Sequence, residues 1–320
     1  MIKSKIDWLN KNVLVTGGTG LIGIQVVKLL HQAGAYILTT SLAGADSESA
    51  AEIAGHARHR RADLTDFETC KDLADSVDYV FHLAGLKGSV LATKKRPADY
   101  FVPMLQMNTN MLEACRLAGV KKVVYASSIG AYAPGANMAE NTALCGDPMD
   151  EYPGWAKRMG EYQLKAYKQQ YDLSWTAVRF CNVYGPGGWF DRDAMVIFAL
   201  MTKIYEHVNP VEVWGDGRAV RDFLYAEDAA RGVMLAVDSK EPLLNIGSGI
   251  GYSIQELVFT LRKVVPFNFK FNVDQPEGYS SRILNTNLIE SLGFKQKVPL
   301  QEGLERTWKW LIEHKPTLIR

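Results

Sequence analysis

The stretch from Val13 to Gly23 constrains the fold of this chain more than any other. It reads Val-Leu-Val-Thr-Gly-Gly-Thr-Gly-Leu-Ile-Gly, and helical periodicity returns over residues 24–32. The apolar run before the glycines is typical of a buried parallel strand. Gly17 permits a tight turn, Gly20 lets a phosphate approach the main chain, and the third glycine lets the helix pack closely on the strand. Such a triplet also occurs in turns without a ligand, but its place between strand and helix predicts a dinucleotide-binding domain.

Composition excludes several classes of protein. The chain has 320 residues, enough for one large domain or two modest ones. Its formal net charge of +1 gives no indication of a nucleic-acid or membrane-surface partner. The four cysteines lack paired spacing, so neither a metal site nor a disulfide framework is predicted. There is no signal peptide and no apolar run near the ~20 residues of a membrane span, so we expect a cytoplasmic protein.

The first half of the sequence alternates between segments typical of strands and of helices. After the first strand at residues 12–16, we expect strands at residues 35–41, 59–64, 77–83, 121–127 and 174–180. Two long helices are expected at residues 97–118 and 154–170. This order predicts a Rossmann-type, doubly wound parallel sheet over residues 1–181.

From about residue 182 the alternation loosens. Helices are expected at residues 194–207, 226–238, 254–264 and 300–313, and strands at residues 243–246 and on both sides of 215–217. Ser253 is expected to cap the third of these helices. We therefore predict a smaller α/β substrate-binding lobe over residues 182–320, joined to the sheet by crossovers.

Short motifs run through most of the chain in a characteristic order. They are residues 16–23, Asp63-Leu64, His82-Leu83-Ala84-Gly85, Ser127-Ser128, Trp155-Ala156-Lys157, and residues 179–186, 214–217, 221–225 and 245–249. Together they resemble the extended short-chain dehydrogenases/reductases, in the branch of NAD(P)-dependent nucleotide-sugar epimerases, dehydratases and ketoreductases. Trp214-Gly215-Asp216-Gly217 and residues 182–195 are most similar to GDP-fucose synthases and related epimerase/reductases.

The resemblance implies two catalytic residues directly. Lys157 matches the lysine that makes a neighbouring tyrosine acidic enough to exchange a proton, and that holds the nicotinamide ribose. The alternative is a solvated lysine on a helix. Ser128 matches the serine that hydrogen-bonds the reacting oxygen, with Ser127 as the second candidate; either serine can also simply cap the strand end.

This sequence departs from the family pattern at the position of the catalytic tyrosine. Pro153 stands four residues before Lys157, and the nearest tyrosine, Tyr152, stands five before it. Proline suits the first turn of a helix, so Tyr152 is expected at or just outside the helix N-terminus. Two interpretations stay open: Tyr152 is the acid/base, or it is a surface tyrosine and another group handles the proton.

Other departures narrow the reaction that the resemblance implies. Gly130 (or Ile129) and Gly187 stand where GDP-fucose synthases carry a cysteine and a histidine, and none of these residues can transfer a proton. Nearby Cys181 is typical of a small buried residue. Residues 127–130 lack the carboxylate with which 4,6-dehydratases protonate a leaving hydroxyl.

We expect redox chemistry at one carbon, most naturally C4, by an epimerase or 4-ketoreductase acting on an NDP-hexose, with GDP-sugars among the candidates. The alternatives are a 4,6-dehydratase, a 4-dehydrogenase, or a regulatory protein that keeps the nucleotide site.

The resemblance also implies a set of cofactor contacts. They are Gly17, Thr19, Gly20, Leu21, Ile22, Gly23, Ser41, Asp63, Leu64, Leu83, Ala84, Gly85, Ser127 and Lys157. An NAD site usually carries a carboxylate at the end of the second strand, where this chain has residues 39–42, Thr-Thr-Ser-Leu. The missing charge favours NADP over NAD, if Arg58, Arg60 or Arg61 folds back; the alternative for this basic cluster is a solvated face.

A second set of residues is expected to bind a nucleoside-diphosphate sugar. It comprises Lys87, Ser128, Asn182, Trp189, Arg221 and Arg282. The planar fork of arginine suits phosphate oxygens. The alternatives are an ion pair of Arg221 with Asp222 or Glu227, and a core position for Trp189. The resemblance further implies a homodimer that pairs through the helices at residues 97–118 and 154–170.

Overall fold

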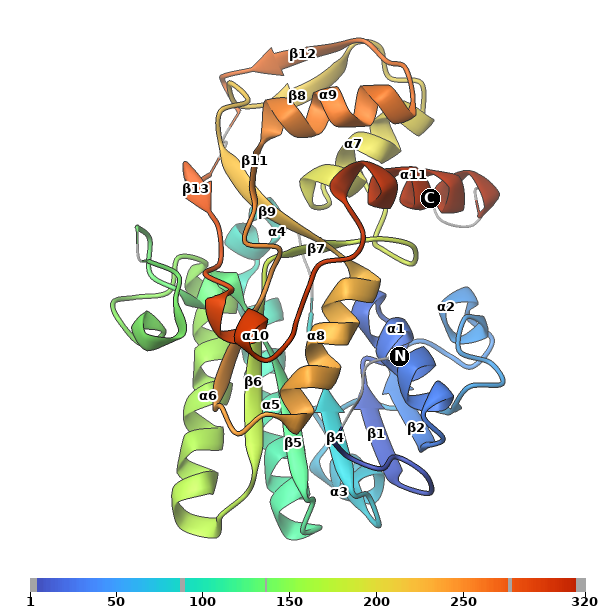
Figure 1. The fold of residues 1–320 in the computed structure, drawn as a ribbon, viewed down its shortest axis with the longest axis vertical. Coiled ribbons are helices and arrows are strands. Elements are labelled where there is room, and N and C mark those ends of the chain that lie inside the picture. Colours follow the sequence, from blue (N-terminus) through green and yellow to red (C-terminus); the bar gives the residue numbers. More distant parts are fainter. Residues whose placement is uncertain (1–4, 87–89, 136, 276–277, 315–320) are drawn as a thin grey trace.

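A seven-stranded parallel sheet forms the lower half of the molecule (Figure 1). The structure is a computed structural model that describes residues 5–86, 90–135, 137–275 and 278–314. The strand order is β10-β6-β5-β4-β1-β2-β3, and every neighbouring pair is parallel. The strands are β1 (Asn12–Thr16), β2 (Tyr36–Ser41), β3 (Arg58–Arg61), β4 (Tyr79–His82), β5 (Lys122–Ser128), β6 (Trp175–Phe180) and β10 (Leu243–Ile246). The order reverses between β1 and β4, which is where ligands bind in open α/β sheets.

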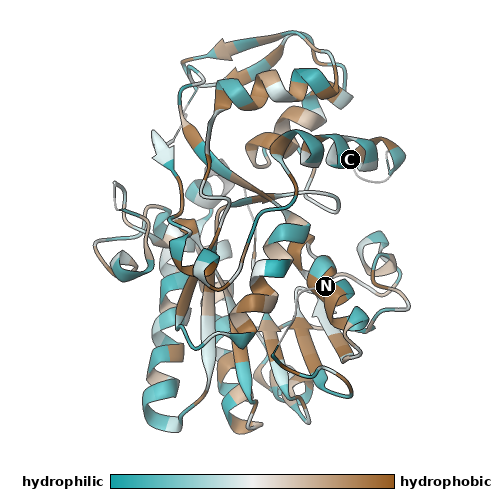
Figure 2. Cartoon of the chain, in the orientation of Figure 1, coloured by the Kyte–Doolittle hydropathy of each residue, from teal (hydrophilic) through white to brown (hydrophobic). Residues whose placement is uncertain are grey.

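Helices cover both faces of this sheet. On one face α1 (Leu21–Gln32) packs against α8 (Ala226–Asp238); on the other lie α3 (Phe67–Ala74), α5 (Pro97–Leu117) and α6 (Glu151–Tyr171). Side chains of β1 alternate between the two cores, with Val13 and Val15 on the α1 side and Leu14 on the α5 side. Figure 2 shows apolar strands between helices whose outer faces are polar. The predicted doubly wound fold is confirmed.

A smaller lobe lies above the carboxyl ends of the strands (Figure 1). One of its sheets contains β7 (Asn182–Tyr184), β9 (Val220–Tyr225), β11 (Gly251–Ser253) and β13 (Ser281–Arg282), and β8 (Val211–Trp214) pairs with β12 (Phe269–Asn272). Its helices are α7 (Val196–Tyr205), α9 (Ile254–Val264) and α11 (Leu300–Glu313). The two strands predicted on either side of residues 215–217 are β8 and β9, which belong to different sheets. Because α8 and β10 return to the large sheet, the lobe is tied to it by crossovers.

Several short elements complete the chain. They are α2 (Glu48–Ala51), α4 (Val90–Lys95), α10 (Asn287–Ser291), and the 3₁₀ helices η1 (Ile129–Ala131) and η2 (Glu140–Thr142). None of the helices in the described ranges is long and apolar enough to cross a membrane.

The start of α6 differs from the prediction. The helix begins at Glu151, three residues earlier than expected, so Tyr152 and Pro153 lie inside its first turn. Proline is compatible with this position because the N–H groups of a first turn have no partner within the helix. Tyr152 is thus the second residue of the helix, so it lies at the N-terminus as expected, and only the predicted start of the helix at residue 154 is wrong.

Candidate active site

The glycine loop between β1 and α1 leaves no room for a side chain at Gly17 or Gly23. Gly17 has a φ of +69°, and a Cβ atom on it would lie 2.9 Å from the nitrogen of Ala84. A Cβ atom on Gly23 would lie 2.1 Å from the carbonyl oxygen of Gly17. Gly20 is the N-cap residue of α1, and no side chain caps this helix end. Its first-turn N–H groups are therefore available to a phosphate, so the loop fits the pyrophosphate of a dinucleotide.

A buried chain of hydrogen bonds fixes the strand ends behind this loop. Thr16 Oγ1 accepts from the N–H of Ala84 at 3.2 Å and lies 2.8 Å from Nδ1 of His82. The other ring nitrogen of His82 lies 3.1 Å from Oδ1 of Asn108, whose amide nitrogen donates to the hydroxyl of Tyr125 at 3.0 Å. Burial lowers the pKa of His82 to about 3, so the ring is neutral. β1, β4 and β5 are thereby locked together where a cofactor would lie.

Lys157 reaches this same edge of the sheet from α6. Its ammonium lies 5.3 Å from the centre of the Tyr125 ring. A Cβ atom on Gly85 would lie 3.3 Å from its Nζ. The side chain therefore points to the end of β4, across from the glycine loop, as expected of a residue that holds a ribose.

The two serines at the end of β5 have different environments. The Ser127 hydroxyl is buried and donates to Oε1 of Glu161 at 2.5 Å, and Glu161 forms an ion pair with Arg179 at 2.6 Å. Ser128 is half-buried, and its Oγ accepts from the N–H of Gly130 at 3.1 Å. The geometry favours Ser128 over Ser127 as the serine that meets a ligand.

Tyr152 faces a different way from Lys157. It is 37% exposed, and its ring packs edge-on against Phe101 of α5 with the centroids 5.9 Å apart. Five residues of α-helix correspond to a rotation of about 140°, so the two side chains leave α6 on different sides. The role of Tyr152 as acid/base stays a prediction.

The adenosine end of the expected cofactor site lies at β2 and β3. Ser41 Oγ accepts from Thr19 Oγ1 at 2.9 Å and from the N–H of Ala43 at 3.2 Å. The register of the two strands pairs Ser41 with Arg61, so both side chains lie on one face of the sheet. Arg60 instead forms an ion pair with Asp72 at 3.4 Å.

Asp63 and Leu64, which lie just beyond the end of β3, are held in place by local hydrogen bonds. Oδ1 of Asp63 accepts from the N–H and the hydroxyl of Thr65, at 2.9 and 2.8 Å. Leu64 is buried, and its carbonyl oxygen accepts from the amide of Asn110 at 3.1 Å. They lie at the carboxyl edge of the sheet, as do the residues after β4.

The lobe contributes two arginines on neighbouring strands. Arg282 of β13 is paired in register with Arg221 of β9. Nη1 of Arg221 donates to the carbonyl oxygen of Tyr279 at 2.7 Å. The alternative partners proposed for Arg221 are engaged elsewhere. Asp222 is buried and accepts from Ser248, and Glu227 pairs with Arg306 at 3.4 Å.

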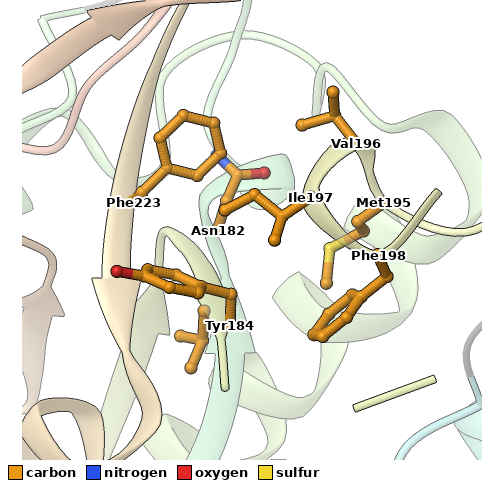
Figure 3. Close-up of a pocket in the computed structure, with 8 residues that line it drawn as sticks. Asn182, Tyr184, Met195, Val196, Ile197, Phe198 and Phe223 are labelled. Carbon is orange, nitrogen blue, oxygen red and sulfur yellow. The ribbon is translucent and has the colours of Figure 1, made fainter. Parts of the chain in front are cut away.

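A small hollow beside these strands is mostly apolar (Figure 3). It is lined by Asn182, Val183, Tyr184, Met195, Val196, Ile197, Phe198 and Phe223. The amide nitrogen of Asn182 donates to the carbonyl oxygen of Asp222 at 3.0 Å, which fixes the orientation of this polar group.

Trp189 is 47% exposed and is not a core residue. Its neighbour Phe190 fills the core, where it contacts Phe198 and stacks on Trp310. Trp189 is therefore free to cover a ligand at the edge of the lobe. Lys87, also expected to contact substrate, lies outside the described residues.

One charged group at the carboxyl edge of the large sheet, the carboxylate of Asp150, was not predicted from the sequence. Asp150, the residue before α6, places its carboxylate against Gly130 and forms an ion pair with Arg282 at 2.7 Å. An aspartate just before a helix is an ordinary capping signal, so nothing in the sequence marked it as unusual. No cluster of three or more metal-ligating side chains occurs within the described ranges.

Comparisons with known proteins find relatives over most of the chain. The family described as NAD dependent epimerase/dehydratase matches residues 13–247. A putative UDP-glucose 4-epimerase of Methanocaldococcus jannaschii is 31% identical, over 93% of this chain and 98% of its own. A probable GDP-L-fucose synthase 1 of Oryza sativa subsp. japonica is 32% identical, over 74% of this chain and 76% of its own. The structure of MoeE5 in complex with UDP-glucose and NAD has a TM-score of 0.81 at 29% identity, and the match covers 95% of this chain and 99% of MoeE5.

Proposed function

Since the chain belongs to the NAD dependent epimerase/dehydratase family, we propose that it oxidises or reduces C4 of a nucleoside-diphosphate hexose, as an epimerase or a 4-ketoreductase. The observation that carries the proposal is the position of Lys157. Its ammonium lies beside Gly85, opposite a glycine loop that fits a pyrophosphate, and on the sheet edge that also exposes Ser128.

Separate residues of the chain would bind the cofactor, orient the reacting oxygen and stabilise its charge in a redox step at a sugar carbon. The bound nicotinamide ring supplies or accepts the hydride. Lys157 binds the ribose next to that ring and stabilises negative charge on the reacting oxygen. Ser128 hydrogen-bonds the same oxygen, and the N–H groups at the start of α1 hold the pyrophosphate.

The lobe would hold the nucleotide part of the substrate. Arg221 and Arg282 are paired in register on β9 and β13, and arginine side chains suit a diphosphate; Arg282 would bind it while Nη2 keeps its pairing with Asp150. Asn182 and the apolar hollow of Figure 3 lie next to these strands. Trp189 would cover the sugar.

For the cofactor, we propose NADP as the preferred dinucleotide. Ser41 carries no charge that would repel a 2′-phosphate, and the strand register sets Arg61 beside it. We also propose that two copies of the chain pair through α5 and α6, which pack against each other on one outer face of the sheet.

The proposal is tested by mixing the protein with NAD⁺ or NADP⁺ and a panel of UDP- and GDP-hexoses. Formation of reduced nicotinamide is followed by near-ultraviolet absorbance, and the sugar products are identified by mass spectrometry. We expect one nucleotide sugar to change the redox state of the cofactor or to return as its C4 epimer or 4-ketose. Tight binding of both ligands with no chemical change would instead indicate a regulatory protein, the alternative that Pro153 favours.

A further inference from the structure

Asp150 occupies the N-cap position of α6 but does not cap that helix. An aspartate there ordinarily accepts a hydrogen bond from an N–H group of the first turn. Here the carboxylate turns toward Gly130: a Cβ atom on Gly130 would lie 2.1 Å from Oδ2 of Asp150 and 2.7 Å from its Cγ. The carboxylate therefore fills the space that a side chain at position 130 would take.

This space adjoins the serine at the end of β5. Ser128 Oγ accepts from the N–H of Gly130 at 3.1 Å, so the Ser128 hydroxyl and the Asp150 carboxylate border the same residue. The Asp150 side chain is 39% exposed. The carboxylate is therefore accessible to a ligand bound beside Gly130.

Lys157 follows Asp150 by seven residues and extends from the second turn of α6. Asp150 itself precedes the helix and has a non-helical backbone, with φ −96° and ψ 87°, so its side chain is placed by its contact with Gly130 and not by the helical repeat. Gly154 of α6 packs on the same residue, since a Cβ atom there would lie 2.5 Å from the carbonyl oxygen of Gly130. A carboxylate, a hydroxyl and an ammonium thus line one edge of the sheet, whereas Tyr152 leaves the helix toward α5.

The lobe holds the carboxylate in place from the other side. Nη2 of Arg282 lies 2.7 Å from Oδ1 of Asp150, and the arginine side chain is only 17% exposed. Nε of Arg282 also lies 2.9 Å from the sulfur of Met149. This pairing uses Oδ1, and Oδ2 is the oxygen that lies over Gly130.

We propose that the carboxylate of Asp150 accepts the proton of the sugar hydroxyl that is oxidised, an inference that rests on the proposed function. The O–H bond breaks, its proton passes to Asp150, and its electron pair forms the carbonyl bond. The hydrogen of the adjacent C–H bond leaves as hydride to the NAD(P)⁺ that the proposed reaction uses. In the reverse direction protonated Asp150 returns the proton to the oxygen as the ketone is reduced.

Asp150→Asn tests this role because it removes the proton acceptor with almost no change in size. We expect kcat to fall about 100-fold for the nucleotide sugar that the wild type turns over fastest, with KM changed by less than about threefold. Asp147→Asn is the matched control, since it removes the same charge at an exposed position three residues earlier and should keep the wild-type kcat. Tyr152→Phe should lower kcat by less than about tenfold.

Chemical rescue separates proton transfer from a structural role. Formate should restore part of the kcat of Asp150→Ala, because a small carboxylate can enter the vacated space beside Gly130, and it should not restore Lys157→Met. Gly130→Ala should lower kcat by displacing the carboxylate, and should cause no further loss when combined with Asp150→Asn.

The inference is overturned if Asp150→Asn keeps the wild-type kcat, if formate restores nothing, or if Tyr152→Phe alone abolishes turnover. A wild-type protein that changes none of the UDP- or GDP-hexoses would overturn the proposed function itself, and the inference with it. That failure is seen before any variant is compared, so the two are distinguishable.

Discussion

At the scale of single residues, buried polar groups behind the glycine loop position the strand ends. His82 is fully buried and lies within hydrogen-bond distance of Thr16 on one side and Asn108 on the other. Both contacts are satisfied by a neutral ring whose Nε2 carries the proton. Protonation would place a charge in the core near the ammonium of Lys157, and burial together with that charge lowers the pKa of His82 to about 3.

This arrangement predicts a loss of stability in acid. An unfolded histidine takes up a proton below about pH 6.5, whereas folded His82 does so only near pH 3, so the unfolded state binds more protons in this window. The free energy of unfolding should therefore fall as the pH is lowered. Between about pH 7 and pH 5 the wild type should lose about 2 kcal/mol more than His82→Gln, measured by urea unfolding. Parallel pH profiles for the two proteins would contradict this account of His82.

Arg61 is the residue on which the proposed cofactor preference depends. If it contacts a 2′-phosphate beside Ser41, Arg61→Ala should raise the KM for NADP⁺ at least about tenfold and leave that for NAD⁺ within about twofold. Arg58→Ala removes an exposed arginine at the other end of the same strand and is the control. An equal change in KM for both dinucleotides would show that Arg61 does not contact the 2′-phosphate.

At the scale of elements, long periodic segments were predictable and short ones were not. The bounds predicted for α8, α9 and α11 are reproduced because their apolar spacing and end signals agree. β13 has two residues and β12 has four, too few to show a period. Both strands exist because tertiary packing supplies their partners.

The residues of the candidate site also fall into those that the sequence could predict and those that it could not. Motifs located Lys157, Ser128 and the glycine loop, since each lies in a stretch with a recognisable pattern. The contact between Asp150 and Arg282 joins two distant segments, and the space over Gly130 exists only in the folded chain. Neither could be predicted without the tertiary structure.

The cap of α9 gives a prediction at this scale. Ser253 Oγ accepts from the N–H of Glu256 at 3.1 Å, and the Glu256 carboxylate accepts from the N–H of Ser253 at 2.8 Å. Ser253→Ala should lower the free energy of unfolding by about 1 kcal/mol, read as a lower Tm by calorimetry. Ser280→Ala, at an exposed serine, should leave Tm unchanged. Equal Tm values for both variants would mean that the cap does not contribute.

At the scale of the whole molecule, the parallel sheet and the lobe would each supply half of a binding site. The sheet edge carries the glycine loop, Ser128 and Lys157, and the lobe carries Arg221 and Arg282. The Asp150–Arg282 pair joins the two parts at the mouth of this site. A substrate held by both parts would lie with its sugar against the sheet edge and its phosphates against the lobe.

The proposed function requires a carbon-bound hydrogen to move between a nucleotide sugar and a dinucleotide on this chain. Its most direct test is to load the protein with NAD(P)⁺, add an NDP-hexose labelled with deuterium at C4, denature the complex and weigh the released cofactor by mass spectrometry. We expect deuterium on the nicotinamide of the reduced cofactor. An unlabelled cofactor from a protein that had bound both ligands would contradict it.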